Sequence, residues 1–238
     1  MSGPLLGASH DGDAADGALR VLVIAPHPDD EVLGVGGTIA RHAAEGAEVT
    51  VLIATKGYPP AFDEDLVRRG RQEARCAHQL LGVHDTLFLD FPAAGLDSVP
   101  HSELNAGIGG VMARVRPDLL YVPFNGDLHR DHQRVFASAL VAARPGHANT
   151  PRAIYAYETL SETNWNAPFV APGFAPNVFT DISAHLEKKL AAMRAYASQV
   201  KQPPHERSVE TLRALATLRG STVGCAAAEA FVLVRQIR

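Results

Sequence analysis

The sequence is poor in cysteine, in long hydrophobic runs and in excess positive charge. Its 238 residues include two cysteines, Cys76 and Cys225, which lie far apart and form no CxxC pair. We therefore expect neither a disulfide framework nor a cysteine-based zinc site, and we expect a cytoplasmic protein. The formal net charge of −4 argues against a nucleic-acid-binding protein, which would carry a basic stripe. No apolar run approaches the ~20 residues of a membrane span, so we expect no stable membrane insertion.

The N-terminal segment has the composition of a tail rather than of a targeting signal. Residues 1–17 are small, polar and acidic, without the basic and then apolar order of a signal peptide. We expect residues 1–18 to be flexible. Residues 19–238 contain neither an internal repeat nor a recognisable linker, and their number suits a single large domain.

Apolar runs of strand length alternate with segments of helical pattern through most of the chain. The first run, Leu19 to Ala25, is almost continuously apolar, as is typical of a parallel strand covered on both faces. A β-α-β-α-β-α-β order over about 100 residues predicts right-handed crossovers and a parallel sheet, so the fold class is α/β. Residues 158–180 are expected to be irregular. The predicted strands are 19–25, 48–55, 85–89, 118–123, 153–158 and 231–235, and the predicted helices are 31–45, 65–81, 102–116, 132–143, 184–198 and 208–218.

The turn after the first predicted strand concentrates acidic side chains. It reads Ala-Pro-His-Pro-Asp-Asp-Glu over residues 25–31 and lies between the strand and the first helix. Three neighbouring carboxylates repel one another unless a cation holds them. Because open α/β sheets bind ligands beyond the carboxyl ends of their strands, this turn predicts a metal site.

A second polar cluster follows the fourth predicted strand. Residues 125–133 read Asn-Gly-Asp-Leu-His-Arg-Asp-His-Gln, and the topology turns them toward the same crevice. The best ligands from the two clusters are His27, Asp30 and His132. Two imidazoles and one carboxylate leave an open coordination position, as in catalytic zinc sites.

The groups beside these ligands suit hydrolysis of an amide. With Zn²⁺, a bound water would have a pKa of roughly 7, and Asp29 is placed to accept its proton. His129 lies three residues before His132 and borders the site. Either Asp131 or Asp127 is suited to hold the His129 ring and keep it cationic. The cation would face an oxyanion or a leaving amine.

Other interpretations compete with this one. Two histidines and one carboxylate also form the triad of non-haem Fe(II) oxygenases. A sugar-binding module that has lost its activity is a further alternative. Gly34, Gly36 and Gly37 suggest a dinucleotide-binding turn, but the carboxylates before them would repel a pyrophosphate. We expect these glycines to let the first helix pack closely on the sheet.

Residues 25–31 together with His129-Arg130-Asp131-His132 resemble the PIG-L/LmbE-like zinc-dependent de-N-acetylases. The similarity extends to residues 71–73, 181–182, 198–199 and 228–231. It implies a Rossmann-like three-layer sandwich with a mostly parallel sheet. It also implies Zn²⁺, or another divalent transition metal, on His27, Asp30 and His132, with Asp29 as general base and His129, oriented by Asp131, as its partner.

The resemblance further implies a substrate and its contacts. The substrate would be an N-acetylated amino sugar or a sugar conjugate, and family members often assemble as trimers or hexamers. Members often carry an arginine at the position of Gly70, and some carry a mobile tyrosine at that of Asp127. The aromatic-rich segment 158–180 and the stretch His205-Glu206-Arg207-Ser208 would contribute further contacts. The candidate substrate-binding residues are Arg69, Arg71, Asp127, Trp165, His205 and Arg207.

Overall fold

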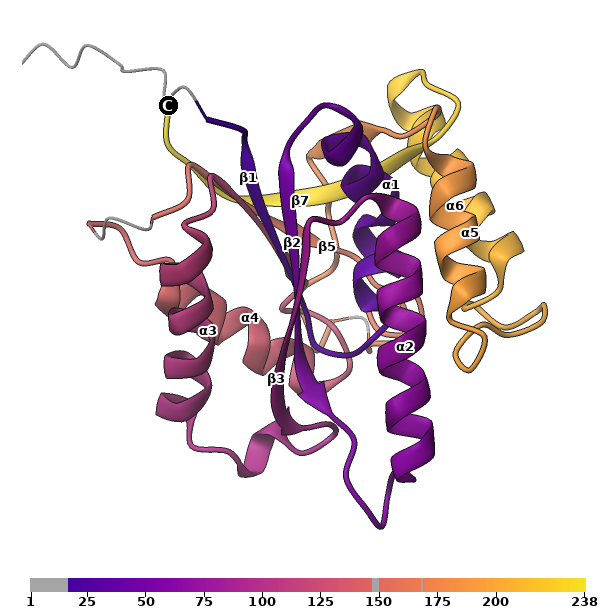
Figure 1. The fold of residues 1–238 in the computed structure, drawn as a ribbon. Coiled ribbons are helices and arrows are strands. Elements are labelled where there is room, and N and C mark those ends of the chain that lie inside the picture. The colour runs from indigo at the N-terminus through magenta and orange to yellow at the C-terminus, as the bar shows by residue number, and fades with distance from the viewer. Residues whose placement is uncertain (1–16, 147–149, 168) are drawn as a thin grey trace, which may run out of the picture.

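A seven-stranded sheet forms the centre of the protein (Figure 1). The computed structural model describes residues 17–146, 150–167 and 169–238. All but the last two residues of the predicted tail, 1–18, lie outside these ranges. The strand order is β3-β2-β1-β4-β5-β7-β6. The strands are β1 (Arg20–Ala25), β2 (Glu48–Lys56), β3 (Asp85–Pro92), β4 (Leu119–Pro123), β5 (Ala153–Tyr157), β6 (Val178–Asp181) and β7 (Ala228–Gln236).

Helices cover both faces of the sheet and complete three layers. In Figure 1, α3 and α4 lie on one side of the sheet, and α1, α2, α5 and α6 lie on the other. None of the helices within the described ranges is long and apolar enough to cross a membrane. The helices are α1 (Asp30–Ala44), α2 (Glu64–Leu81), α3 (His101–Val115), α4 (Arg130–Ala142), α5 (Leu186–Ala195) and α6 (Val209–Val223), with a short 3₁₀ helix, η1 (Leu96–Ser98).

The alternation of side chains along β1 divides the core into two parts. Val21 and Val23 pack with α1, α2 and α5, whereas Leu22 and Ile24 pack with α3 and α4. Every one of these four side chains is fully buried. A strand buried on both faces needs apolar residues throughout, which explains the near-continuous apolar run in the sequence.

The pairing of the strands confirms the prediction of a mostly parallel sheet. Strands β1 to β5 pair in parallel, whereas β7 pairs antiparallel with both β5 and β6. The order of the strands reverses at β1, which lies between β2 and β4. The carboxyl ends of β1 and β4 therefore meet at the switch point of the sheet, where such folds bind ligands.

Several element boundaries differ from those predicted, and the largest differences lie in the last third of the chain. Residues 178–181 form β6, whereas 158–180 were expected to be irregular throughout. Helix α5 is shorter than the predicted helix 184–198. Strand β7 is longer than the predicted strand 231–235. Strand β6 is short and lies at the edge of the sheet, so it lacks the apolar run by which a buried strand is recognised.

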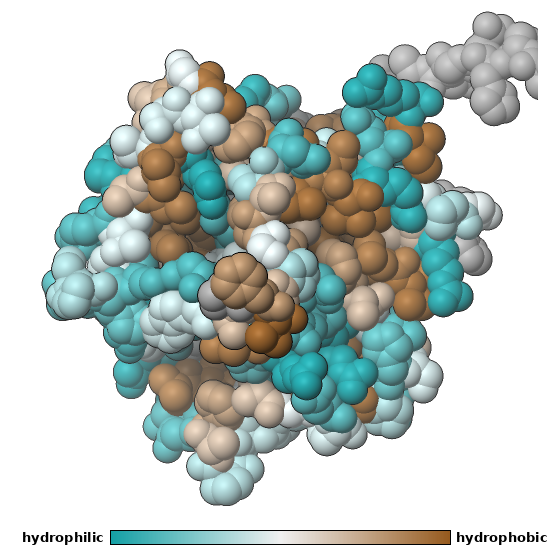
Figure 2. Space-filling model, turned by 180° about the vertical axis from the view of Figure 1, so that it is seen from behind, coloured by the Kyte–Doolittle hydropathy of each residue, from teal (hydrophilic) through white to brown (hydrophobic). Residues whose placement is uncertain are grey.

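The segment between β5 and β6 places apolar side chains on the surface. Phe169 and Val170 are almost fully exposed, and Trp165 is half exposed. The face opposite to that of Figure 1 carries separate apolar patches among polar side chains (Figure 2).

Close packing of α1 requires glycine at two positions. A Cβ atom on Gly34 would overlap the Tyr157 ring of β5, and one on Gly37 would lie 2.6 Å from Cδ1 of Ile182. Ile182 is fully buried and follows β6. The expectation that the glycines let α1 pack closely on the sheet is confirmed at Gly34, whereas Gly37 allows close contact with Ile182 and Gly36 with Lys189 of α5.

Substitution of Gly37 by alanine should therefore destabilise the protein. We expect Gly37→Ala to lower the free energy of unfolding by ~1–3 kcal/mol, because the added methyl group overpacks the core. At Gly110, in α3, an added methyl group would meet open space, and there Gly→Ala should stabilise the helix by ~1 kcal/mol. Chemical denaturation of both variants measures the difference. Equal effects at the two positions would contradict the packing argument.

Candidate metal and catalytic site

Two polar loops meet at the carboxyl ends of β1 and β4. His27 and Asp30 come from the turn between β1 and α1, and His132 comes from the first turn of α4. The Asp30 Oδ2 atom lies 3.3 Å from His27 Nδ1 and 3.2 Å from His132 Nε2. One ligand atom from each of the three residues lies within 4.8 Å of the others. The predicted ligands are thus brought together.

The bonding of His132 fits a metal ion. Its Nδ1 atom is 2.8 Å from Asp127 Oδ2, so the proton of the neutral ring belongs on Nδ1. Its Nε2 atom is buried and has no hydrogen-bond partner among the described residues. Asp30 Oδ2 lies 3.2 Å from this Nε2. Burial lowers the pKa of His132, but Asp30 and Asp127 outweigh it and raise the pKa to about 10, so a positive charge is favoured at Nε2, whether a proton or a metal ion supplies it. Two imidazoles and one carboxylate suit a divalent transition metal.

Each candidate histidine ligand is held by a further carboxylate. The Asp131 Oδ2 atom lies 2.9 Å from His27 Nε2, and Asp127 occupies the equivalent position on His132. Asp131 is fixed in turn by the backbone N–H groups of Ala94 and Leu96. Such carboxylate–histidine pairs set the ring orientation and increase the basicity of the ligand nitrogen.

The contacts of His129 differ from those predicted. The Asp131 carboxylate lies 4.0 Å from His129 Nδ1, farther than from His27. Instead, the backbone N–H of Asp131 donates to His129 Nδ1 at 3.1 Å, with His129 as the N-cap of α4. Nδ1 is therefore an acceptor, and the ring proton belongs on Nε2. Burial and the neighbouring His27 lower the pKa of His129, so the expectation of a cationic ring is not met.

Asp29 occupies a strained position beside the candidate ligands. It caps α1 without a side-chain capping bond, and its φ of 110° lies in the region that favours glycine. Its carboxylate is buried, and Arg207 Nη1 lies 3.2 Å from Oδ2. Burial raises the pKa of Asp29 to about 8, although the Arg207 charge opposes the increase. By contrast, His132 and His27 outweigh burial at Asp30 and hold its pKa well below the usual range.

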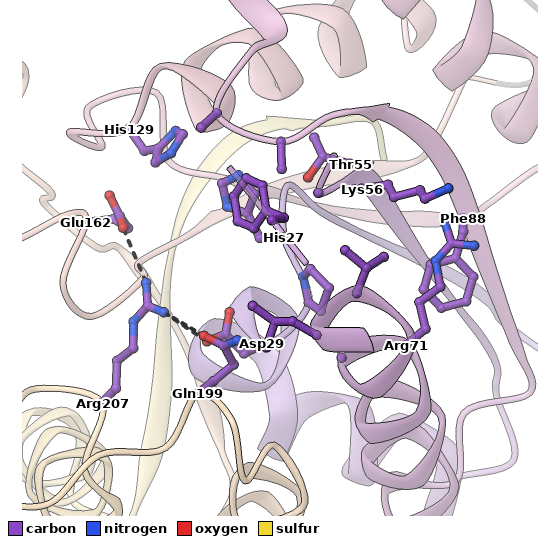
Figure 3. A pocket seen from close by; sticks show the side chains of 18 residues that line it. His27, Asp29, Thr55, Lys56, Arg71, Phe88, His129, Glu162, Gln199 and Arg207 are labelled. Atoms are coloured by element: carbon purple, nitrogen blue, oxygen red, sulfur yellow. Dashed lines mark hydrogen bonds and ion pairs between the residues drawn. The ribbon is translucent and has the colours of Figure 1, made fainter. Parts of the chain in front are cut away.

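A cavity of about 250 Å³ opens onto these residues (Figure 3). His27 and Asp29 lie near its middle. His129, Glu162, Gln199 and Arg207 line one side, and Lys56, Arg71 and Phe88 lie on the other. The Arg207 guanidinium also lies 3.5 Å from Glu162 Oε1 and donates to Gln199. The cavity therefore has a polar, charged wall next to the Asp29 carboxylate.

The candidate substrate residues divide into two groups. Arg71 and Arg207 line the cavity, whereas Arg69, Trp165 and His205 do not, and Arg69 is exposed on α2. Asp127 is fully buried behind His132 and also accepts from the Thr163 hydroxyl, so its position corrects its assignment as a substrate contact.

Sequence analysis did not single out Glu162 and Gln199 as site residues, although segment 158–180 was expected to contact the substrate and residues 198–199 share the family resemblance. Their contacts with Arg207 bring both side chains to the cavity.

A family profile described as PIG-L, GlcNAc-PI de-N-acetylase, matches residues 22–143. The chain belongs to the PIG-L family. The matched residues include the three candidate ligands, Asp29 and His129. A diacetylchitobiose deacetylase from Thermococcus kodakarensis is 31% identical over 222 residues, covering 86% of this chain and 79% of the relative. A 1D-myo-inositol 2-acetamido-2-deoxy-alpha-D-glucopyranoside deacetylase from Actinosynnema mirum is 32% identical over 231 residues. The match covers 76% of this chain and 81% of the relative.

Solved structures of PIG-L relatives and other proteins share the fold. The conserved protein TT1542 from Thermus thermophilus has a TM-score of 0.76 at 30% identity, covering 92% of this chain and 96% of that one. The N,N'-diacetylchitobiose deacetylase from Pyrococcus horikoshii has a TM-score of 0.72 at 27% identity. The superposition covers 91% of this chain and 84% of that one. A 4-carboxy-2-hydroxymuconate hydratase superposes with a TM-score of 0.71 at 22% identity. The fold alone therefore does not determine the reaction.

Loss of the Asp127 charge should weaken metal binding. We expect Asp127→Asn to lower the affinity for Zn²⁺ by ~10- to 100-fold, because His132 loses the carboxylate that orients it and increases its basicity. Competition with a chromophoric chelator measures the affinity. Asp97→Asn is the matched control, since Asp97 is exposed and pairs only with Arg134 in the described chain. An unchanged affinity in Asp127→Asn would rule out the orienting role.

The backbone strain at Asp29 should be measurable as stability. We expect Asp29→Gly to be more stable than Asp29→Ala by ~1 kcal/mol, because both lack the carboxylate and only glycine adopts the positive φ without strain. For a protein of this size that corresponds to a Tm difference of ~2–4 °C. Thermal unfolding of the two variants makes the comparison. Equal Tm values would show that the turn is unstrained.

Proposed function

We propose that this protein hydrolyses the N-acetyl group of an N-acetylated amino sugar or sugar conjugate, with Zn²⁺ held by His27, Asp30 and His132. The observation that carries the proposal is the unpartnered His132 Nε2 facing Asp30 at a cavity that also holds the buried Asp29. A bound divalent metal would polarise the acetyl carbonyl and increase the acidity of the attacking water. Zn²⁺ is favoured because it commonly binds two histidines and a carboxylate at a hydrolytic site.

Asp29 is the general base of the proposed reaction. Its carboxylate lines the cavity next to the candidate ligand Asp30, and its pKa of about 8 suits proton transfer near neutral pH. Arg207 opposes the effect of burial on that pKa and so favours the carboxylate form. Arg207 also fixes the direction of the carboxylate through its contact with Oδ2.

His129 is a neutral hydrogen-bond donor in the proposed reaction. Its Nδ1 accepts from the Asp131 backbone, which leaves Nε2–H to donate to the oxygen that gains charge as the carbonyl is attacked. A neutral imidazole is a poor source of a full proton. We therefore assign the protonation of the leaving amine to Asp29, which carries the proton taken from the attacking water.

The cavity supports a sugar as the group that carries the amide. Glu162, Gln199 and Arg207 offer acceptors and donors for hydroxyl groups beside Asp29. Both relatives described above are named for substrates that carry acetylated amino sugars. No observation favours the alternative of an Fe(II) oxygenase.

Acetate release tests this function. We expect the Zn²⁺-loaded protein to release acetate from N-acetylglucosamine, diacetylchitobiose or an N-acetylglucosaminide, to lose this activity on chelation and to regain it with Zn²⁺. Asp29→Asn should keep the metal and lose ~10²–10⁴-fold in kcat, because the base is absent. His132→Ala should lose the metal itself.

The assay pairs acetate measurement with detection of the free amine and with metal content. Asp97→Asn serves as the control variant with normal metal content and activity. Full activity after stringent metal removal, or metal loss in Asp29→Asn with retention in His132→Ala, would contradict the assignment of roles.

A further inference from the structure

Glu31 lies fully buried beneath the Asp29 turn and has three hydrogen-bond partners. Its Oε2 accepts from the backbone N–H of Asp29 at 3.2 Å. Its Oε1 accepts from the Tyr196 hydroxyl at 2.5 Å and lies 3.1 Å from His78 Nε2. A buried carboxylate is costly unless such donors surround it.

The three partners come from different parts of the fold. His78 lies in α2, and its Nδ1 contacts the Thr86 hydroxyl of β3 at 2.8 Å. Tyr196 directly follows α5. All of these side chains except Thr86 are at most 2% exposed. The position of Glu31 is therefore set by two helices and by the edge strand β3 at once.

The group held by this cluster is the strained backbone of Asp29. A residue other than glycine keeps a positive φ only where its surroundings over-determine its conformation. Here the N–H of Asp29 is bound by Glu31, and its carbonyl accepts from the backbone of Val32 and Leu33. Asp29 lines the cavity, and its carboxylate accepts from Arg207.

We propose that Glu31, His78 and Tyr196 form a buried platform that positions Asp29 for catalysis. The catalytic part of this inference rests on the proposed role of Asp29 as the base. None of the three side chains lines the cavity, so they are positioning residues. Their effect should appear in kcat, since misplacement of a base raises the barrier while the metal ligands and the cavity wall remain.

The first test removes single contacts of the platform. We expect Tyr196→Phe and His78→Gln each to lower kcat about tenfold or more, with KM and metal content within about twofold of the wild type. The matched controls are Tyr121→Phe and His42→Gln. Tyr121 is buried, and its hydroxyl lies 3.0 Å from His42 Nε2. His42 is in the last turn of α1, at the opposite end of that helix from Asp29. The controls should lower Tm comparably and leave kcat unchanged.

A second test uses Glu31 itself. Glu31→Gln keeps an oxygen that accepts from Asp29 N–H, whereas Glu31→Leu does not. We expect kcat of Glu31→Gln to exceed that of Glu31→Leu by about tenfold or more at equal metal content. If Glu31→Leu fails to fold, the tyrosine and histidine variants decide the question.

A third readout does not depend on activity, so it separates failure of the platform from failure of the proposed function. In a double-mutant cycle of unfolding, Glu31→Leu and Asp29→Gly should couple by at least about threefold in the equilibrium constant, because Glu31→Leu removes the acceptor of Asp29 N–H and glycine removes the strain that the platform supports. If Glu31→Leu fails to fold, Tyr196→Phe takes its place in the cycle. Strictly additive changes in the free energy of unfolding would overturn the proposed platform. Unchanged kcat in both Tyr196→Phe and His78→Gln, with Tm lowered as in the controls, would also overturn it.

Discussion

The approach of Asp30 to two histidine nitrogens is the interaction on which the remaining site depends. Its Oδ2 atom lies 3.3 Å from His27 Nδ1 and 3.2 Å from His132 Nε2. His132 Nε2 is buried and has no hydrogen-bond partner among the described residues, so a cation beside Asp30 is favoured there. The sheet order makes this approach possible, because β1 and β4 are neighbours although about 100 residues separate them in the chain. Asp127 and Asp131 then hold the two rings from their outer sides.

The turn that supplies Asp29 combines two features that lower stability. Its backbone is strained and its carboxylate is buried, with Arg207 as the compensating charge. Each feature alone would favour replacement of Asp29 by glycine. In the proposed reaction both are needed, because burial raises the pKa toward neutrality and the positive φ directs the carboxylate into the cavity. The proposed platform offsets part of this instability, because Glu31 accepts a hydrogen bond from the backbone N–H of Asp29.

That the three candidate metal ligands lie together was predictable, because each follows a strongly apolar strand and the carboxyl ends of parallel strands meet at one edge of the sheet. The wall of the cavity was predictable only in part, because Arg71 and Arg207 line it whereas Arg69, Trp165 and His205 do not. Arg69 and Arg71 differ by two positions on one helix, and a rotation of about 200° separates their directions, so only Arg71 reaches the cavity. The Asp131 carboxylate hydrogen-bonds to His27 and not to His129 because of how the two rings are oriented, which the sequence does not show. Strand β6 forms because it pairs with β7, and no local sequence pattern indicates that pairing.

The division of the site between parts of the chain bears on specificity. The region that matches the PIG-L family, residues 22–143, contains the candidate ligands, Asp29 and His129. The polar wall beside Asp29 comes from later segments, with Glu162 between β5 and β6 and with Gln199 and Arg207 between α5 and α6. Arg207 joins the two halves, because the same guanidinium contacts Asp29 and Glu162. A sugar bound against this wall would therefore act directly on the group that directs the base, which couples recognition of the substrate to the proposed proton transfer.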